Sequence, residues 1–140
     1  MKKFASRWML PVATALLLAP IAPAYSETIQ IGPNFKPDPQ VLSGTSGGNK
    51  NSDCGSISAA PNQVIQVREA VPYLRLNVQG AGQPTLLVEG PQGRFCVLAN
   101  AAGGGPKMAG FWGPGNYSVF IGDRGQGRHP YTLSLTQTPE

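Results

Sequence analysis

The stretch that decides the fold is residues 73–96, YLRLNVQGAGQPTLLVEGPQGRFC. Its first seven residues alternate strictly, with Leu74, Leu76 and Val78 on one face and mostly polar side chains on the other. Alternation with a period of two is typical of a strand that buries one face. Residues 89–94, EGPQGR, then predict a hairpin loop, because glycine and proline favour tight turns. The centre of the chain is therefore predicted to be β-structure.

The same alternation recurs toward the C-terminus, at 117–121 and 131–135. Shorter strands are predicted at 28–31, 63–68, 85–89, 94–98 and 107–112. Turns rich in Gly and Pro separate these segments at short intervals, as in an antiparallel sandwich. Beyond residue 26, no ten-residue window free of Gly and Pro carries a helical apolar stripe, so we expect no long helix. The predicted fold class is all-β, an antiparallel β-sandwich of jelly-roll or immunoglobulin-like type.

Residues 27–60 have a different composition, rich in Pro, Gly, Asn and Ser. We predict a partly ordered N-terminal segment here, with an extended path at 37–39 and a flexible loop at 44–53. The β-sandwich core is predicted over 61–140. Residues 27–140 together are expected to form one domain, because 114 residues suffice for one modest core.

Residues 1–26 predict a secretory signal peptide. Three basic side chains precede an apolar run at 9–21, and Ala24-Tyr25-Ser26 forms a small-x-small cleavage site. Prolines interrupt the run, which falls short of the ~20 residues that span a bilayer. We expect an exported protein, periplasmic or extracellular, or in the thylakoid lumen if the source is photosynthetic, with no membrane span after cleavage.

The charge of the mature chain disfavours nucleic acid as a partner. Lys2, Lys3 and Arg7 leave with the signal peptide, so eight basic and seven acidic residues remain and the net charge is +1. The basic residues are scattered singly between Lys36 and Arg128. A nearly neutral chain of this kind has no strong field to attract polyanions.

Cys54 and Cys96 are the two cysteines of the chain. An exported protein meets an oxidising compartment, so we expect them to form one structural disulfide. The alternative, a catalytic or metal-binding thiol pair, would require a nearby partner or C-x-x-C spacing, which the sequence does not contain.

Three segments in order carry a family resemblance: 34–48 (NFKPDPQVLSGTSGG) leading to Cys54, 73–96, and 109–135 (AGFWGPGNYSVFIGDRGQGRHPYTLSL). Together they resemble a family of small exported bacterial β-sandwich proteins, many from photosynthetic bacteria, that is similar to the bacterial pre-peptidase C-terminal domain. The resemblance spans nearly all of the mature chain and implies the fold. It does not imply an activity of its own.

What the resemblance implies about function is limited. Pre-peptidase domains are non-catalytic accessories of secreted proteases, which implies a role in localisation or substrate contact, by analogy alone because this chain carries no protease domain. The family usually continues its hairpin cysteine into a short acidic pair, a feature suited to cations. Here Cys96 is followed by Val97-Leu98-Ala99-Asn100, so no metal site carries over.

The catalytic interpretation rests on residues 44–48, GTSGG, which resemble the serine nucleophile loop of trypsin-like proteases. Thr45 stands where that motif has an acid, and a double barrel does not fit in this length. His129, the lone histidine, precedes Pro130 in a turn rich in Gly and Arg, which suits a solvated loop residue. A Ser46/His129/Asp triad is the remaining alternative, and we assign no catalytic residue and expect no enzyme activity.

The sequence predicts no binding site for a metal ion or a cofactor. One histidine, a cysteine pair expected to be oxidised and isolated carboxylates provide no ligand spacing. The glycine-rich segments at 103–105 and 122–127 do not open a helix, so a phosphate cradle would lack its dipole. Asp123 is interpreted as a turn residue.

Aromatic residues provide the main indication of binding. Phe111, Trp112 and Tyr117 flank the turn at 113–115, and an exposed Trp and Tyr stack well on a sugar ring or a partner surface. The alternative, which we favour, is that Tyr117 forms a tyrosine corner and Trp112 covers the core. A surface patch of Tyr73, Arg75, Arg124 and Arg128 is the second candidate for binding.

The sequence therefore favours a non-enzymatic, exported β-sandwich module that contacts a protein or a polysaccharide of the envelope. A structural subunit of a membrane-associated assembly, docked through a sheet edge or through residues 32–39, is the alternative. An autonomous hydrolase ranks last.

Overall fold

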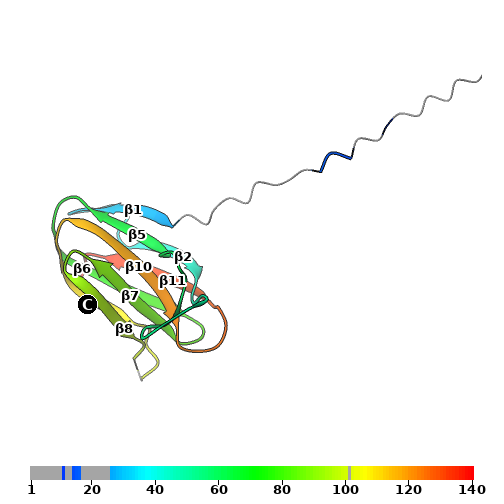
Figure 1. Ribbon diagram of the computed structural model, residues 1–140. Helices are drawn as coiled ribbons and strands as arrows, with labels where there is room; N and C mark the ends of the chain where they lie inside the picture. The colour runs from blue at the N-terminus through cyan, green and yellow to red at the C-terminus, as the bar shows by residue number, and fades with distance from the viewer. Residues whose placement is uncertain (1–10, 12–13, 17–25, 101) are drawn as a thin grey trace, which may run out of the picture.

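The computed structural model describes residues 11, 14–16, 26–100 and 102–140. The predicted signal peptide, residues 1–26, lies almost entirely outside this part and stays a prediction. The described residues form eleven strands and no helix (Figure 1), which confirms the all-β prediction.

One sheet contains seven strands. Its path is β1 (Glu27–Ile31), β5 (Gln63–Val67), β10 (Gly115–Asp123), β4 (Gly55–Ile57) and β3 (Lys50–Ser52), and a branch leads from β10 through β7 (Pro84–Gly90) to β8 (Gly93–Leu98). Strand β10 is thus the centre of the sheet. Strand β4 meets it at one position, where Ser56 lies opposite Asp123.

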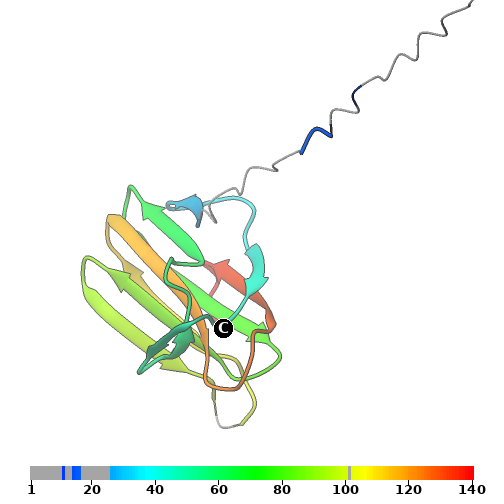
Figure 2. The same cartoon turned by 45° about the vertical axis from the view of Figure 1, so that its right-hand side comes forward.

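The second sheet contains four strands in the order β2 (Gln40–Thr45), β11 (Pro130–Thr136), β6 (Val71–Gly80) and β9 (Lys107–Trp112). The two sheets form the two layers of a sandwich (Figure 2). All strand pairs are antiparallel except β1 with β5, which run parallel.

Part of the N-terminal prediction was wrong. Residues 44–53, predicted as a flexible loop, include the end of β2 and all of β3, and residues 27–60 contribute four strands. The physical reason is pairing with distant segments: β2 lies along β11 from Gln40 opposite Leu135 to Thr45 opposite Pro130. A segment as poor in apolar residues as β2 shows little periodicity of its own and owes its strand conformation to its neighbour.

The main core lies between the two sheets. Its members are the inward side chains of the alternating strands, joined by two aromatic residues from β9 and β10 and by residues of β1 and β2: Ile29, Ile31, Leu42, Ile65, Val67, Val71, Leu74, Leu76, Val78, Leu86, Val88, Trp112, Tyr117, Val119, Ile121, Tyr131, Leu133 and Leu135. The period-two pattern of the sequence is therefore the pattern of burial.

A second, smaller core lies on the outer face of the seven-stranded sheet. Cys54, Ile57, Leu87 and Phe120 form it, beneath the hairpin of β3 and β4. Cys54 is bonded to Cys96 of β8 with a Cα–Cα distance of 5.8 Å, which confirms the predicted disulfide. The disulfide ties this hairpin to the sheet that it covers.

Strands β8 and β9 each have one partner, so each leaves one edge unpaired. They end the two sheets on the same side of the sandwich and follow each other in the chain. In Figure 1, β8 lies at the edge of the nearer sheet.

Candidate functional site

Ser46 and His129, the two residues named in the catalytic hypothesis, meet Asp123 at one end of the sandwich. Asp123 ends β10, Ser46 follows β2, and His129 precedes β11. The strands bring them together because β10 and β11 belong to facing sheets and β2 pairs with β11.

The order of their hydrogen bonds is not that of a catalytic triad. The Ser46 hydroxyl donates to Asp123 Oδ2 over 3.0 Å, and His129 Nδ1 lies 2.9 Å from the same oxygen. In a triad the imidazole lies between the hydroxyl and the carboxylate. Here the carboxylate lies between them, and Ser46 Oγ instead accepts the backbone N–H of His129 over 3.2 Å. Ser46 is also only 1% exposed, so no substrate reaches its hydroxyl without rearrangement.

Asp123 is better described as a buried acceptor that joins three loops. In addition to Ser46 and His129, its Oδ1 accepts the backbone N–H groups of Gln83, over 3.1 Å, and Gly125, over 2.7 Å. The turn between β6 and β7 packs directly on this cluster: a Cβ added to Gly82, whose φ is +75°, would lie 2.6 Å from Asp123 Oδ2 and 2.5 Å from His129 Nδ1. Glycine is therefore required at position 82 by conformation and by space.

Electrostatics agree with this description. Burial raises the pKa of Asp123, and the four hydrogen bonds, with His129 first, outweigh burial and hold the pKa below its ordinary value of 3.8. The carboxylate is thus ionised at neutral pH. The sequence named Ser46 and His129, but interpreted Asp123 as an ordinary turn residue; no local signal distinguishes a buried turn aspartate from an exposed one.

An apolar cleft opens at the opposite end of β10, between the unpaired edges of β8 and β9. Its volume is about 270 Å³. Trp112, Tyr117 and Val88 are buried beneath it, while Phe95 and Phe111 are exposed at its rim, at 44% and 64%. Leu98, 43% exposed, lies farther along β8, so three exposed apolar side chains belong to these two strands.

The base of the cleft is held by a tyrosine corner. The Tyr117 hydroxyl donates to the carbonyl oxygen of Gly113 over 2.7 Å, and Gln92 Oε1 lies 3.0 Å from it. The rings of Trp112 and Tyr117 pack with centroids 4.5 Å apart. The sequence analysis favoured this arrangement, with Tyr117 in a tyrosine corner and Trp112 covering the core.

Trp112 needs a correction as a binding residue. Only 3% of it is exposed, because it packs between the sheets, so it supports the cleft and offers a partner little surface. Phe95 was missed by the sequence reasoning, since its strand looks like any half-buried strand and only its place on an unpaired edge exposes it.

The predicted patch of Tyr73, Arg75, Arg124 and Arg128 does not exist as one surface. Tyr73 borders a hollow formed with residues 34–38, and Arg75 lies 3.4 Å from Glu140. Arg124 and Arg128 lie on the loop between β10 and β11 and line another hollow. Positions 73 and 75 lie at the start of β6, whereas the loop follows the end of β10. The end of β6 lies beside the end of β10, where Gly82 packs on Asp123, so the start of β6 is far from the loop.

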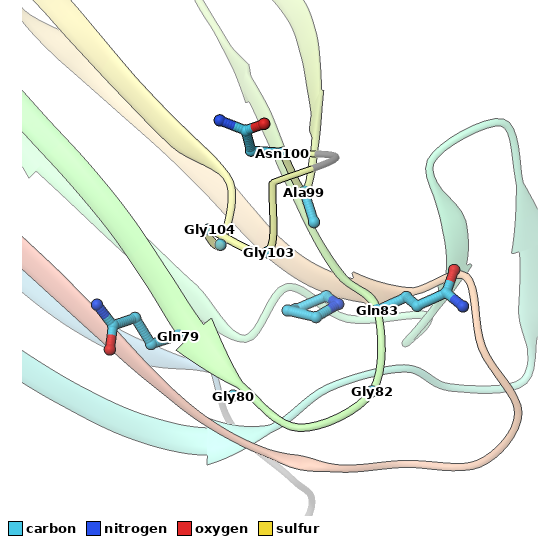
Figure 3. Close-up of a pocket in the computed structure, with 10 residues that line it drawn as sticks. Gln79, Gly80, Gly82, Gln83, Ala99, Asn100, Gly103 and Gly104 are labelled. Carbon is cyan, nitrogen blue, oxygen red and sulfur yellow. The ribbon is translucent and has the colours of Figure 1, made fainter.

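A further hollow of about 470 Å³ lies between the β6–β7 turn and the loop that follows β8 (Figure 3). The side chains of Gln79, Gln83 and Asn100 extend away from one another rather than converging, and the walls are largely glycine backbone. This arrangement provides no set of groups aimed at one ligand atom.

Metal-binding and membrane-spanning features are also absent from the part of the chain that the structure describes. Its His, Cys, Asp and Glu side chains form no group of three or more that would hold an ion. No helix in the same residues has the length and apolar character to cross a membrane.

Comparison with known proteins places the chain in a family. No protein-family model matches the chain. It is 41% identical over 133 residues to "Uncharacterized protein Synpcc7942_2126" from Synechococcus elongatus, across 92% of this chain and 95% of that protein.

A solved structure shares the fold. The pre-peptidase C-terminal domain of collagenase from Bacillus anthracis superposes with a TM-score of 0.52 at 18% identity, over 80% of this chain and 97% of that chain. The likeness confirms the predicted resemblance in architecture. At this identity it says nothing about a shared activity.

Proposed function

Because the chain belongs to the family of the Synechococcus elongatus protein Synpcc7942_2126, with a pre-peptidase C-terminal-like fold, we propose that it is a non-catalytic, exported module that binds a partner protein through the apolar cleft. The observation that carries this proposal is the exposure of Phe95 and Phe111 on β8 and β9, two neighbouring strands that each have one unpaired edge. Exposed aromatic side chains grouped around a preformed cleft are typical of a protein contact surface.

The size and chemistry of the cleft favour one large side chain as its occupant. A volume of about 270 Å³ is below the range of about 300–1,000 Å³ typical of small-molecule sites. Its lining is mostly apolar, with Gln92 as a polar side chain. An aromatic or long aliphatic side chain of a partner fits this combination, and main-chain groups on the free strand edges lie beside it for further contacts.

The arrangement around Ser46 supports the non-catalytic part of the proposal. Its hydroxyl hydrogen is directed to Asp123 and its side chain is buried, so it is poorly suited to attack a substrate. Export is supported by the composition of residues 1–26 and by the Cys54–Cys96 disulfide, which is stable in an oxidising compartment.

The test is affinity capture from envelope extract with three forms of the protein. Phe95→Ser/Phe111→Ser removes both rim aromatics, and Val41→Ser, 55% exposed on β2 at the opposite edge, is the matched control. We expect wild type and Val41→Ser to retain the same discrete partner and the double variant to bind it at least about tenfold more weakly.

Each outcome bears on the proposal. Equal retention by all three forms, or no partner for any form, contradicts binding at the cleft. A partner that remains in a stoichiometric complex through purification would favour the structural-subunit alternative. Labelling of Ser46 by a serine-reactive probe would favour the hydrolase.

A further inference from the structure

The loop between β10 and β11, RGQGRH at 124–129, carries two arginines at the end of the molecule away from the cleft. Tyr117 of the cleft and Asp123 at the start of this loop are six residues apart on one strand, or about 20 Å. The loop is therefore a separate surface from the one proposed to bind protein.

The base of this loop is fixed by the buried carboxylate of Asp123. Besides the contacts of that carboxylate with Gly125 and His129, the backbone N–H of Arg124 donates to the carbonyl oxygen of Gln83 over 3.0 Å. The backbone N–H of Ser46 donates to the carbonyl oxygen of His129 over 2.8 Å. Both ends of the loop are thus fixed in the folded protein. A ligand that binds there therefore does not have to order the loop, which would cost conformational entropy.

Arg124 and Arg128 have no acidic partner among the described residues. The ion pairs there join Arg75 and Lys107 to Glu140, Arg94 to Asp53 and Glu89, and His129 to Asp123. Asp123 is the nearest carboxylate in sequence, but its oxygens are already occupied by four donors. Two positive charges against one buried negative charge give residues 123–129 a net charge of +1.

The two arginines border a hollow of about 550 Å³ between the loop and the β3–β4 hairpin, which lie side by side (Figure 1). The arginine hollow, as we name it, is also lined by Asn49, Ser56, Gln126 and glycine backbone, and by no acidic, aromatic or large apolar side chain. Its wall therefore combines two guanidinium groups with neutral hydrogen-bonding groups.

We propose that the arginine hollow binds an acidic sugar unit of an envelope polysaccharide. Arg124 and Arg128 hold its carboxylate or sulfate, because guanidinium groups match planar or tetrahedral oxyanions with paired N–H donors. Ser56, Asn49 and Gln126 provide donors and acceptors for its hydroxyl groups. The volume exceeds the need of a bare anion and leaves room for the ring that carries it.

Other polyanions fit the hollow less well. Attachment to an anionic membrane typically takes clusters of about 4–8 basic residues, and two arginines fall short. Nucleic-acid binding depends on many phosphate contacts, which a chain with a mature net charge of +1 does not provide. An acidic peptide would gain little beyond its charge, because the wall offers no apolar side chain as an anchor.

The test is a titration of the purified protein followed by amide NMR shifts, with trigalacturonate as the carboxylated probe and a sulfated galactose trimer as the second. A neutral galactose trimer, triglutamate and inorganic sulfate are the comparison probes. We expect saturable binding of an acidic trimer with a dissociation constant of about 0.1–1 mM, as for a few exposed charged contacts. The carboxylated and sulfated probes distinguish the two sources of the anionic group.

The decisive variant is Arg124→Gln/Arg128→Gln, and Lys36→Gln/Arg68→Gln is its control. The control removes the same charge from exposed positions outside the hollow. We expect the first to weaken binding at least about tenfold and the second to change it less than about twofold. Amide shifts in wild type should map to 124–128 and the β3–β4 hairpin.

Four results would overturn the proposal. Three concern the probes: no saturable binding of either acidic trimer, equal binding of the neutral trimer, or binding of triglutamate or sulfate alone as tight as that of the acidic sugars. The fourth is an equal loss of affinity in the two double variants. The triglutamate result would instead assign the hollow to acidic peptides. Because the arginine side chains make no hydrogen bond in the described structure, their replacement should leave the melting temperature unchanged, which separates lost binding from lost folding.

Discussion

At the scale of single residues, Asp123 shows how a buried charge is made compatible with a small core. Removing a carboxylate from water is costly unless donors replace the lost hydration. Four donors from three loops do so here, two of them backbone N–H groups. The residue that the sequence analysis interpreted as a simple turn residue is instead a structural junction, and it holds the loop that presents Arg124 and Arg128.

Replacing Asp123 with Asn should destabilise the protein at neutral pH by about 2 kcal/mol, since the amide cannot accept from all four donors. The folded pKa lies below 3.8, so the contribution of the carboxylate is complete above about pH 5 and is lost as the pH falls through the folded pKa. Urea unfolding of wild type and Asp123→Asn between pH 7 and pH 2.5 should therefore show a gap in stability that is constant above about pH 5 and narrows as the pH falls below about 4.

Glu69→Gln is the matched control, an exposed carboxylate converted to an amide. It should follow the wild type across the whole range. A gap between Asp123→Asn and wild type that stays constant down to pH 2.5 would contradict the role given to the ionised carboxylate.

At the scale of elements, the hairpin of β3 and β4 depends most on a covalent link. Each of these strands has three residues, and β4 meets β10 at a single position. The hairpin is held over Leu87 and Phe120 by the Cys54–Cys96 disulfide and by a hydrogen bond that the Thr85 hydroxyl of β7 donates to the Cys54 carbonyl oxygen. The hairpin also forms one wall of the arginine hollow.

Reduction of this disulfide should lower the free energy of unfolding by about 2–4 kcal/mol, because the bond closes a loop with a sequence separation of 42. Thermal unfolding with and without reductant should then differ by about 10 °C. A Cys54→Ala/Cys96→Ala variant should match the reduced wild type and show no response to reductant. An unchanged melting temperature on reduction would show that the hairpin is held by packing alone.

At the scale of the whole molecule, the first strands of the chain are needed to complete the sandwich. Strands β1 and β2 lie at one edge of each sheet, and Ile29, Ile31 and Leu42 are part of the main core. Burying three aliphatic side chains contributes about 5–9 kcal/mol, which is comparable to the whole stability of a typical domain. Without β2, strand β11 would also expose an unpaired edge.

A fragment of residues 61–140, the core predicted from the alternation that begins after Pro61, should therefore fail to fold alone. We expect a poorly dispersed amide NMR spectrum and concentration-dependent aggregation, against a dispersed spectrum for the intact protein. A fragment with a dispersed amide NMR spectrum and a cooperative unfolding transition would show that the core folds independently of β1 and β2.

Much of the fold was predictable from periodicity. Strands β5 to β11 are all near predicted segments, because β5, β6 and β11 alternate in sequence and turn residues bound the others. Strands β2, β3 and β4 were missed, because short polar strands acquire their conformation from hydrogen-bonded neighbours. The cysteine pairing was predictable because the chain contains two cysteines and only one pairing exists.

The sequence by itself determined the all-β class, the family resemblance and the disulfide, since alternation, turn residues and cysteine count are local properties. Only the tertiary structure decided which side chains meet. It placed Asp123 between Ser46 and His129, buried Trp112, exposed Phe95 and separated Tyr73 and Arg75 from Arg124 and Arg128. The physical reason is that exposure and hydrogen-bond order depend on strand order and on which edges stay unpaired, and these arise from contacts between residues far apart in the chain.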